Sequence, residues 1–235
     1  MFVKLRLNFS FFKLKNELKK VKDKNYNPEE IIDALFDKKL SLIQPWQYKS
    51  EFSKLLAHYY NLKPNKIMEI GTANGGTLFA HCKLANENAT IISVDLPGGK
   101  FGGGYPTWKI PIFNEFAKSN QYLHLIRGSS YEQETFEKVK KILDTDLLDY
   151  IFIDGDHTYA GVKKDFDMYS PLVKKGGSIV FHDIALHKES SFQVDLFWKD
   201  IKTNFEHYEF IQDKDHGKFG IGIFIKWYEK QFIFY

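Results

Sequence analysis

Short apolar runs alternate with helix-patterned segments through most of this sequence. The apolar runs lie at 66–70, 90–95, 122–127, 148–154 and 177–183, and helical periodicity lies near 76–86, 109–119, 131–144 and 158–174. Because continuous apolar strands must be covered on both faces, the alternation predicts a parallel sheet between two layers of helices. Two further runs, 208–213 and 219–227, follow with a short polar link, which predicts a terminal hairpin.

The predicted fold is therefore an α/β, Rossmann-like, doubly wound sheet with helices on both faces. It has seven strands, mostly parallel, and the last strand runs antiparallel. Ahead of it, Asn27 and Pro28 are typical of a helix start, so a helix is expected over 27–40, and another over about 46–61. We divide the chain into a basic N-terminal helical extension, 1–45, and a main domain, 46–235.

Charge is unevenly distributed along the chain. The whole chain carries +3, but residues 1–24 hold seven Lys and one Arg against Glu17 and Asp23, a net +6. One interpretation is a basic amphipathic segment that contacts an anionic membrane or a partner. The other, which we favour, is a packing arm with a solvated cationic face. No nucleic-acid motif accompanies the charge, so nucleic acid is not an expected partner.

The compartment is inferred from what the sequence lacks. No apolar run reaches the roughly 18 residues of a membrane span, and the N-terminus has no signal-peptide pattern. Cys82 is the only cysteine, so no intramolecular disulfide can form. We expect a cytoplasmic protein.

The first predicted strand runs into "EIGTANGG", an acidic residue followed by a glycine-rich turn. Glycines let the backbone turn tightly and approach a ligand closely. The spacing differs from the G-x-G-x-x-G of dinucleotide sites, and Glu69 would repel a pyrophosphate. A cationic or zwitterionic ligand fits this turn better, although a plain strand-to-helix turn is the simpler alternative.

Two other strand ends carry candidate ligand contacts. Asp95 ends the second strand 24 residues after Gly71, where a carboxylate can accept hydrogen bonds from ribose hydroxyls. Ser129 and Ser130 follow the third strand and could contact a base or amino group. Loop serines and strand-end aspartates are common, so the indication depends on the glycine turn and Asp95 occurring together.

The "MEIGTANGG" motif with Asp95 resembles the cofactor-binding half of class I S-adenosylmethionine-dependent methyltransferases. The resemblance covers about residues 46–225. It implies that the turn wraps the amino-acid end of the cofactor and that Asp95 holds the ribose. The predicted cofactor-binding residues are Glu69, Gly71, Thr72, Ala73, Gly75, Gly76, Asp95, Ser129, Ser130 and Asp154.

A second constellation follows the fourth and fifth strands. Asp154, Asp156 and His157 follow the fourth strand, and His182 and Asp183 follow the fifth. Adjacent parallel strands lie about 4.8 Å apart, so these ends can converge on one ion. Carboxylates favour Mg²⁺, whereas a His ligand shifts the preference toward Mn²⁺. The alternatives are a hydrated turn at 154–157 and a satisfied core histidine at 182.

This pattern resembles the metal-dependent O-methyltransferases of sugar and macrolide tailoring and the related cephalosporin-hydroxylase-like proteins. The resemblance implies metal ligands at Asp154 and Asp183, and His182 stands where that family often has Asp or Glu. The predicted ligands are Asp154, His182 and Asp183, for Mg²⁺ or Mn²⁺.

The predicted activity is metal-assisted O-methylation of a hydroxyl on a sugar or other polyhydroxylated small molecule. His157 is the first choice for the general base, because its unperturbed pKa suits that task, and Asp156 is the second. The alternatives are a dinucleotide-dependent oxidoreductase and a non-catalytic binding protein that keeps the cofactor fold.

Other segments give weaker indications. The loop 96–108 either closes over the ligands, with Tyr105 and Trp108 packing on a ring, or is a flexible surface loop. Three residues ahead of the main domain are weaker candidates to cover the cofactor: Gln44, Trp46 and Gln47. Side chains expected on solvated or non-functional positions are Asp165, Asp167, His187, His207 and His216. The aromatic tail, 227–235, favours edge or interface packing and a possible homodimer.

Overall fold

The computed structural model describes residues 2–36, 38–98, 104–212 and 217–227. Its elements, in chain order, are α1 (Phe2–Lys20), α2 (Pro28–Phe36), η1 (Lys38–Ile43), α3 (Lys49–Leu62), β1 (Lys66–Ile70), α4 (Gly76–Leu84), β2 (Thr90–Asp95), η2 (Thr107–Lys109), α5 (Ile110–Phe113), β3 (Tyr122–Arg127), α6 (Gln133–Leu143), β4 (Leu148–Ile153), α7 (Tyr159–Tyr169), η3 (Ser170–Leu172), β5 (Val173–His182), α8 (Val194–Ile201), η4 (Lys202–Asn204), β6 (Glu206–Phe210) and β7 (Ile221–Ile225).

The strands form one seven-stranded sheet in the order β3-β2-β1-β4-β5-β7-β6. The pairs among β1 to β5 are parallel, and β7 is antiparallel to both β5 and β6. The predicted fold class is thus confirmed, including the antiparallel last strand. The chain order reverses at β1, where β2 lies on one side and β4 on the other, so the switch point lies between the strands that carry the predicted motifs.

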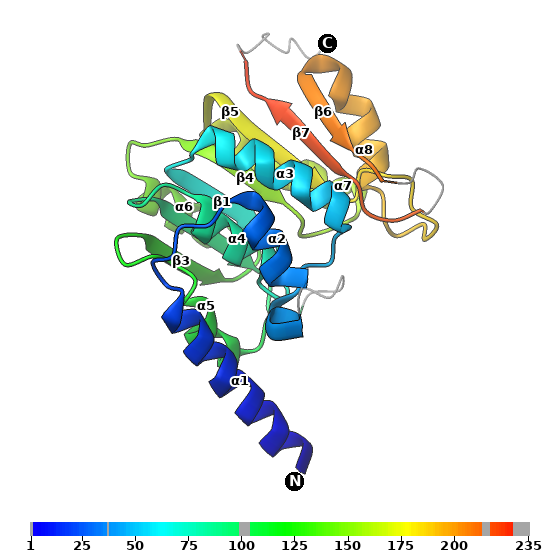
Figure 1. Ribbon diagram of the computed structural model, residues 1–235. Coiled ribbons are helices and arrows are strands. Elements are labelled where there is room, and N and C mark those ends of the chain that lie inside the picture. Colours follow the sequence, from blue (N-terminus) through cyan, green and yellow to red (C-terminus); the bar gives the residue numbers. More distant parts are fainter. Residues whose placement is uncertain (1, 37, 99–103, 213–216, 228–235) are drawn as a thin grey trace.

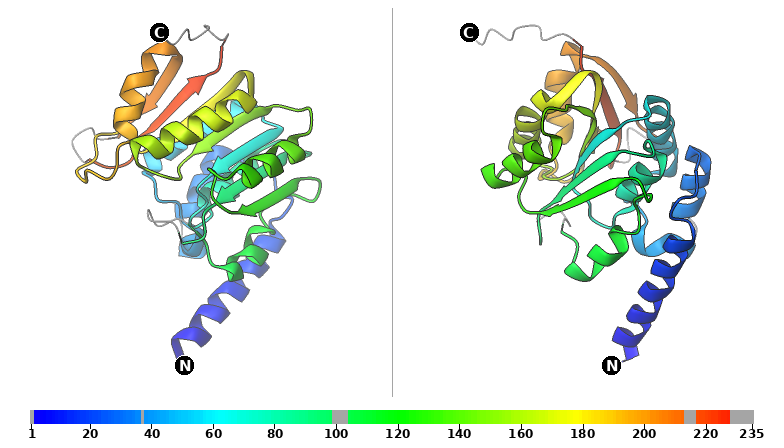
Figure 2. Two further views of the ribbon diagram at one scale, coloured as in Figure 1. Left: turned by 180° about the vertical axis from the view of Figure 1, so that it is seen from behind. Right: turned by 90° about the vertical axis from the view of Figure 1, so that its left-hand side faces the viewer.

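Helices cover both faces of the sheet. In Figure 1, α2, α3 and α4 lie over the near face, and the view from behind in Figure 2 shows α6 and α7 over the other. Successive strand residues point to opposite faces. Accordingly, Ile67 packs in a cluster with Phe52 and Leu55, whereas its neighbour Met68 packs in a separate cluster with Val139.

Two helical predictions differ from the structure. The helix expected over 109–119 is only α5, because after it the backbone makes i to i−3 bonds: Glu115 N donates to Ile112 O and Phe116 N to Phe113 O. Helix α8 was not expected. It buries Phe197 and Trp198 against the sheet and leaves its other side exposed.

The start of α2 forms as predicted. Asn27 Oδ1 accepts from Glu30 N at 2.8 Å, and Asn27 N donates back to the Glu30 carboxylate at 3.0 Å. This reciprocal pair satisfies two main-chain donors that the helix itself leaves free. Buried residues of α2 belong to the same cluster as the sheet residue Ile67. The boundary at 45/46 stays a prediction.

Helix α1 extends from the body, and its N-terminal part projects away from it (Figure 1). Its C-terminal half is anchored: Leu14 and Leu18 are buried, and Lys83 Nζ donates to Val21 O and Lys22 O at 3.2 and 2.6 Å. Phe12 is 67% exposed. Among the described residues, no helix combines the length and apolarity that crossing a bilayer requires.

Candidate active site

A cavity of about 440 Å³ opens at the carboxyl ends of β1, β2, β4 and β5. Predicted residues that line it are Gly71, Ala73, Asp95, Ser129, Ser130, Asp154, Asp156, His157, His182 and Asp183. The two constellations predicted from the sequence, the glycine turn with Asp95 and the Asp–His pairs, therefore open into one space. Its volume lies in the range of small-molecule sites.

The turn after β1 requires glycine at its first position. Gly71 has φ +93°, and its N–H donates to Val94 O at 2.9 Å. A Cβ at this position would lie 2.0 Å from the carbonyl oxygen of Asp154. The bare backbone therefore lets the ends of β1, β2 and β4 meet, and it leaves the cavity open on the other side.

Four residues of the predicted cofactor set are absent from the cavity lining. Neither Glu69 nor Thr72 nor the glycines at 75 and 76 line the cavity. Glu69 is fully buried, its Oε2 lies 3.3 Å from His81 Nδ1, and Ser93 Oγ donates to its Oε1 at 3.3 Å. Glu69 therefore does not line the cavity, and its predicted contact with the cofactor stays a prediction. Its carboxylate belongs to a buried polar network that supports the turn.

The N-terminus of α4 is covered by the chain ahead of α3. A Cβ on Gly76 would meet the carbonyl oxygen of Ile43 at 2.4 Å and Pro45 at 2.6 Å. Dinucleotide sites place a pyrophosphate at such a helix start, and here Ile43 and Pro45 pack against the first residue of the helix. Trp46, in the same segment, lines the cavity as predicted. Gln44 and Gln47 do not; the Gln47 amide donates to Thr77 Oγ1 at 3.4 Å.

Asp95 connects the glycine turn to the loop that follows β2. Its Oδ2 accepts from Ala73 N at 3.1 Å, and its Oδ1 accepts from Gly104 N at 3.0 Å. Burial raises the pKa of Asp95 to about 6. Each carboxylate oxygen has a second lone pair, so Asp95 can still accept hydrogen bonds from a ribose.

The described ends of the loop 96–108 do not place its aromatic residues in the cavity. Tyr105 is buried against Phe113, with ring centroids 4.8 Å apart. Trp108 contacts Phe11 of α1 at 3.9 Å between centroids. The predicted packing of these two rings on a ligand is therefore wrong for this conformation. Residues 99–103, which contain most of the loop's glycines, lie outside the described residues.

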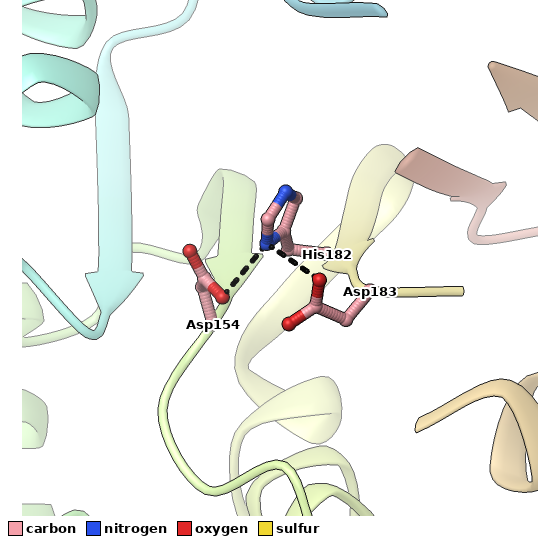
Figure 3. A group of neighbouring side chains, drawn as sticks. All are labelled: Asp154, His182 and Asp183. Atoms are coloured by element: carbon pink, nitrogen blue, oxygen red, sulfur yellow. Dashed lines mark hydrogen bonds and ion pairs between the residues drawn. The ribbon is translucent and has the colours of Figure 1, made fainter. Parts of the chain in front are cut away.

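The predicted metal ligands converge (Figure 3). His182 Nδ1 lies 3.1 Å from Asp154 Oδ1 and 3.5 Å from Asp183 Oδ1, and one ligand atom from each residue lies within 4.8 Å of the others. His182 and Asp183 are buried. Within the described chain, His182 Nε2 has no hydrogen-bond partner. Two carboxylates and an imidazole form a plausible donor set for a divalent cation.

His157 completes this cluster, and Asp156 does not. His157 Nδ1 lies 3.0 Å from Asp183 Oδ2, and its Nε2 lies 3.4 Å from Asp154 Oδ1. Asp156 instead accepts from Thr158 N at 2.9 Å, and its side chain packs against Gly161. Between the two candidate bases, the geometry favours His157.

In this cluster, the charges of Asp154 and His182 shift each other's pKa. Burial alone would raise the pKa of Asp154, but His182 and His157 outweigh it and hold that pKa well below its usual range. Burial alone would likewise lower the pKa of His182, but Asp154 and Asp183 raise it to about 9. The cluster therefore holds positive charge on imidazole, at a place where a cation could substitute for it.

The far wall of the cavity was not predicted from the sequence. It contains His187, Phe192, Lys218 and Phe219. The rings of His187 and Phe192 stack with centroids 4.1 Å apart, and Phe192 lies 4.8 Å from His157. The expectation that His187 lies outside any site is wrong. The available signal was topological, because these residues follow β5 or precede the antiparallel β7, and both positions lie at the carboxyl edge.

The expectation that Asp165 lies on a solvated face is also wrong. Asp167 is exposed as expected, but Asp165 is fully buried. It shares a helix face with Gly161 and Tyr169, four residues away on either side. Burial raises the pKa of Asp165 to about 7, and the nearby Asp156 adds to the shift.

Comparisons with known proteins identify a methyltransferase domain in this chain. A family model described as a methyltransferase domain matches residues 68–184. The protein y4gI of Sinorhizobium fredii is 28% identical over 159 residues, 66% of this chain and 17% of that protein. The protein R132 of Acanthamoeba polyphaga mimivirus is 35% identical over 136 residues, 54% of this chain and 55% of that protein. The chain thus spans about half or less of the length of these curated relatives.

Solved structures share the fold. An O-methyltransferase from Bacillus cereus in complex with S-adenosylhomocysteine has a TM-score of 0.57 at 14% identity, over 85% of this chain and 90% of that one. The methyltransferase MycE of mycinamycin biosynthesis, in complex with Mg, S-adenosylhomocysteine and mycinamycin VI, has a TM-score of 0.57 at 14% identity, over 91% of this chain and 58% of that one. The chain belongs to the methyltransferase family that the matching model describes, with its methyltransferase domain at residues 68–184.

Proposed function

We propose that this protein transfers the methyl group of S-adenosylmethionine to a hydroxyl of a sugar or another polyhydroxylated small molecule, with the help of a divalent metal ion. The observation that carries the proposal is a shared space. Asp95 and the glycine turn line the same cavity as the cluster of Asp154, His182 and Asp183.

The cofactor half of the cavity fits S-adenosylmethionine. Gly71 and Ala73 present main chain to the space, and Asp95 lies where a ribose could donate to it. The covered start of α4 argues against a dinucleotide, and the family match argues against an oxidoreductase. The complexes of the two structural neighbours with S-adenosylhomocysteine support the same cofactor.

The cluster fits a divalent cation by its donor chemistry. Asp154 and Asp183 offer carboxylate oxygens and His182 offers a ring nitrogen, a mixture that suits Mn²⁺ as well as Mg²⁺. Both carboxylates contact Nδ1 of His182, and its buried Nε2 has no hydrogen-bond partner among the described residues, so the ring still has a nitrogen to offer a ligand. MycE, with Mg in its complex, supports a metal in this fold.

The chemistry divides between the bound groups and the chain. The cofactor supplies an activated methyl group, and a divalent cation supplies positive charge that lowers the pKa of an acceptor hydroxyl. Asp183 Oδ2 lies 3.0 Å from His157 Nδ1 and orients the imidazole ring. His157 Nε2 would accept the proton of the acceptor hydroxyl while the methyl group passes from the cofactor sulfur to the hydroxyl oxygen.

The test is transfer of labelled methyl from S-adenosylmethionine to a panel of glycosides, with Mn²⁺, with Mg²⁺ and with a chelator. We expect transfer that depends on the metal. The variant His157→Ala should lose about 10²- to 10⁴-fold in turnover, the usual contribution of a general base, and keep its affinity for S-adenosylhomocysteine. Unchanged turnover would remove His157 from this role. Cofactor binding without transfer to any acceptor would favour a non-catalytic binding protein.

A further inference from the structure

A buried carboxylate outside the cavity is connected to its far wall. Glu51 lies in the first turn of α3 and is 2% exposed. Its Oε1 accepts from Gln212 N at 2.7 Å, and its Oε2 accepts from Gly220 N at 3.0 Å. A buried carboxylate is stable only when its oxygens are satisfied in this way, so both bonds are needed.

These two bonds join both ends of one segment. Gln212 follows β6 and Gly220 precedes β7, so Glu51 holds the connection between the two strands at its beginning and at its end. The described part of this connection carries Lys218 and Phe219, which line the cavity. The position of this wall therefore depends on a residue 161 to 169 positions earlier in the sequence.

The same segment is bonded to the turn that carries Asp183. Ala185 N donates to Phe219 O at 2.9 Å, and Ile184 N donates to Gly220 O at 3.3 Å. Asp183 has φ +60°, a left-handed conformation that is costly for a residue with a side chain. Such a conformation persists only where the surroundings determine it, and the bonds at the next two residues provide that constraint.

The segment that Glu51 holds also contacts His182. Phe219, itself at φ +64°, has its ring centroid 5.5 Å from His182 and 4.9 Å from Tyr48. One carboxylate thus influences the backbone beside Asp183 and the surroundings of His182.

We propose that Glu51 is a positioning residue. It holds the segment 217–220 and, through that segment, the geometry of Asp183 and His182 on the side of the cleft formed by β5 and the segment before β7. The metal part of this inference rests on the proposed function. Glu51 does not line the cavity, so it is not a catalytic residue.

Asp149 provides a matched control. Its buried Oδ2 also accepts from two main-chain donors, Asn65 N at 2.6 Å and Lys66 N at 2.8 Å. It lies beside the start of β4, at the opposite end of the sheet from the cavity. Glu51→Gln and Asp149→Asn therefore both replace a buried carboxylate by an amide, one beside the cavity wall and one at the other end of the sheet. Asp149→Asn also removes an ion pair, because Lys174 Nζ lies 2.5 Å from Asp149 Oδ1.

The experiment compares these variants with wild type by three measurements: Mn²⁺ affinity from electron paramagnetic resonance, S-adenosylhomocysteine affinity from calorimetry, and amide hydrogen exchange. We expect Glu51→Gln to weaken Mn²⁺ binding about 10-fold, the low end of outer-shell effects, and to speed exchange at 184–185 and 217–220. S-adenosylhomocysteine affinity should stay within about twofold of wild type. Asp149→Asn should lower the melting temperature and leave Mn²⁺ affinity and these amides unchanged.

Equal effects of the two variants, or no effect of Glu51→Gln on either Mn²⁺ affinity or exchange, would overturn the inference. Glu51→Asp, whose shorter side chain keeps the charge, should give an intermediate Mn²⁺ affinity and serves as the second variant if the amide does not fold. Wild type that binds no Mn²⁺ would instead overturn the proposed metal assistance, and the exchange comparison would still test Glu51.

Discussion

The proposed cofactor half of the cleft is bounded by the ends of β1, β2 and β3, whereas the proposed acceptor half is bounded by the end of β5 and the segment before β7. In the first half, each key residue lies next in sequence to the strand that positions it. Gly71 and Asp95 directly follow or end the strands that place them, and their bonds run between adjacent strands. In the second half, Asp183 and Phe219 both have left-handed backbone, held by bonds across the sheet.

This difference indicates how each half can change. Replacing the one glycine on which the turn depends should displace the backbone of the turn and abolish cofactor binding. A wall that depends on long-range bonds can shift by small amounts without loss of the fold. The predictions below test that contrast, from the largest expected effect to the smallest.

Gly71→Ala should abolish cofactor binding. A Cβ there would lie 2.0 Å from Asp154 O, and the residue would also keep a left-handed φ. We expect S-adenosylhomocysteine affinity to fall by at least about 100-fold, as displacements of 1 Å can cause, in a calorimetric titration. Gly176→Ala is the control, because Gly176 has φ +78° but nothing within 4 Å of its Cβ. Equal affinities in the two variants would contradict the account of the turn.

Asp154→Asn should separate the metal from the cofactor. The change removes one of two carboxylates from the cluster. Mn²⁺ affinity, measured by electron paramagnetic resonance, should fall by more than the roughly 10- to 100-fold typical of outer-shell changes. The fold should persist, because the Asp154 main chain still donates to Ile70 O. Retention of wild-type Mn²⁺ affinity would show that this cluster is not the metal site.

Asp95→Asn is the reciprocal test. Hydrogen bonds to a charged group contribute about 1.5–3 kcal/mol, so their loss should weaken S-adenosylhomocysteine by roughly 10- to 100-fold. Mn²⁺ affinity should not change, because Asp95 is not in the metal cluster. A variant that loses both affinities equally would show that the two halves are not independent.

Asp165→Asn should have the smallest effect, and it should depend on pH. Burial raises the pKa of Asp165 from 3.8 to about 7, so its contribution to stability is fully present below pH 3.8 and is lost as the pH rises through 7. The amide stays neutral. The melting temperature of the variant relative to wild type should therefore increase between pH 5 and pH 8. A difference that does not vary with pH would contradict this.

The sequence predicted most of the fold because apolar periodicity reports it directly. The bounds of β1, β2 and β3 agree with the predicted apolar runs. Helix α8 was not predicted because it is short and lies between the long loop after β5 and strand β6, although its apolar residues at 194, 197, 198 and 201 have helical spacing. The burial of Asp165 was not predicted because an isolated aspartate on a helix usually faces solvent, whereas this one lies on the same helix face as the buried Gly161 and Tyr169.

The candidate site was predictable to the extent that its residues end strands. Asp154, His182 and Asp183 could be placed together because parallel neighbours finish at one edge. The buried contacts of Glu69 with His81 and Ser93 could not be predicted, because the sequence does not show which way a strand-end side chain points. Phe192 and Phe219 were missed because loops carry no periodicity that fixes their course.

The central claim is that cofactor and metal occupy one cleft. The most direct measurement is the NMR signal of S-adenosylmethionine labelled with ¹³C at the transferable methyl, recorded on the protein with and without Mn²⁺. The account predicts strong paramagnetic broadening of the bound methyl in wild type and its loss in Asp154→Asn. A bound methyl signal that Mn²⁺ leaves unchanged, at concentrations where the metal is bound, would contradict it.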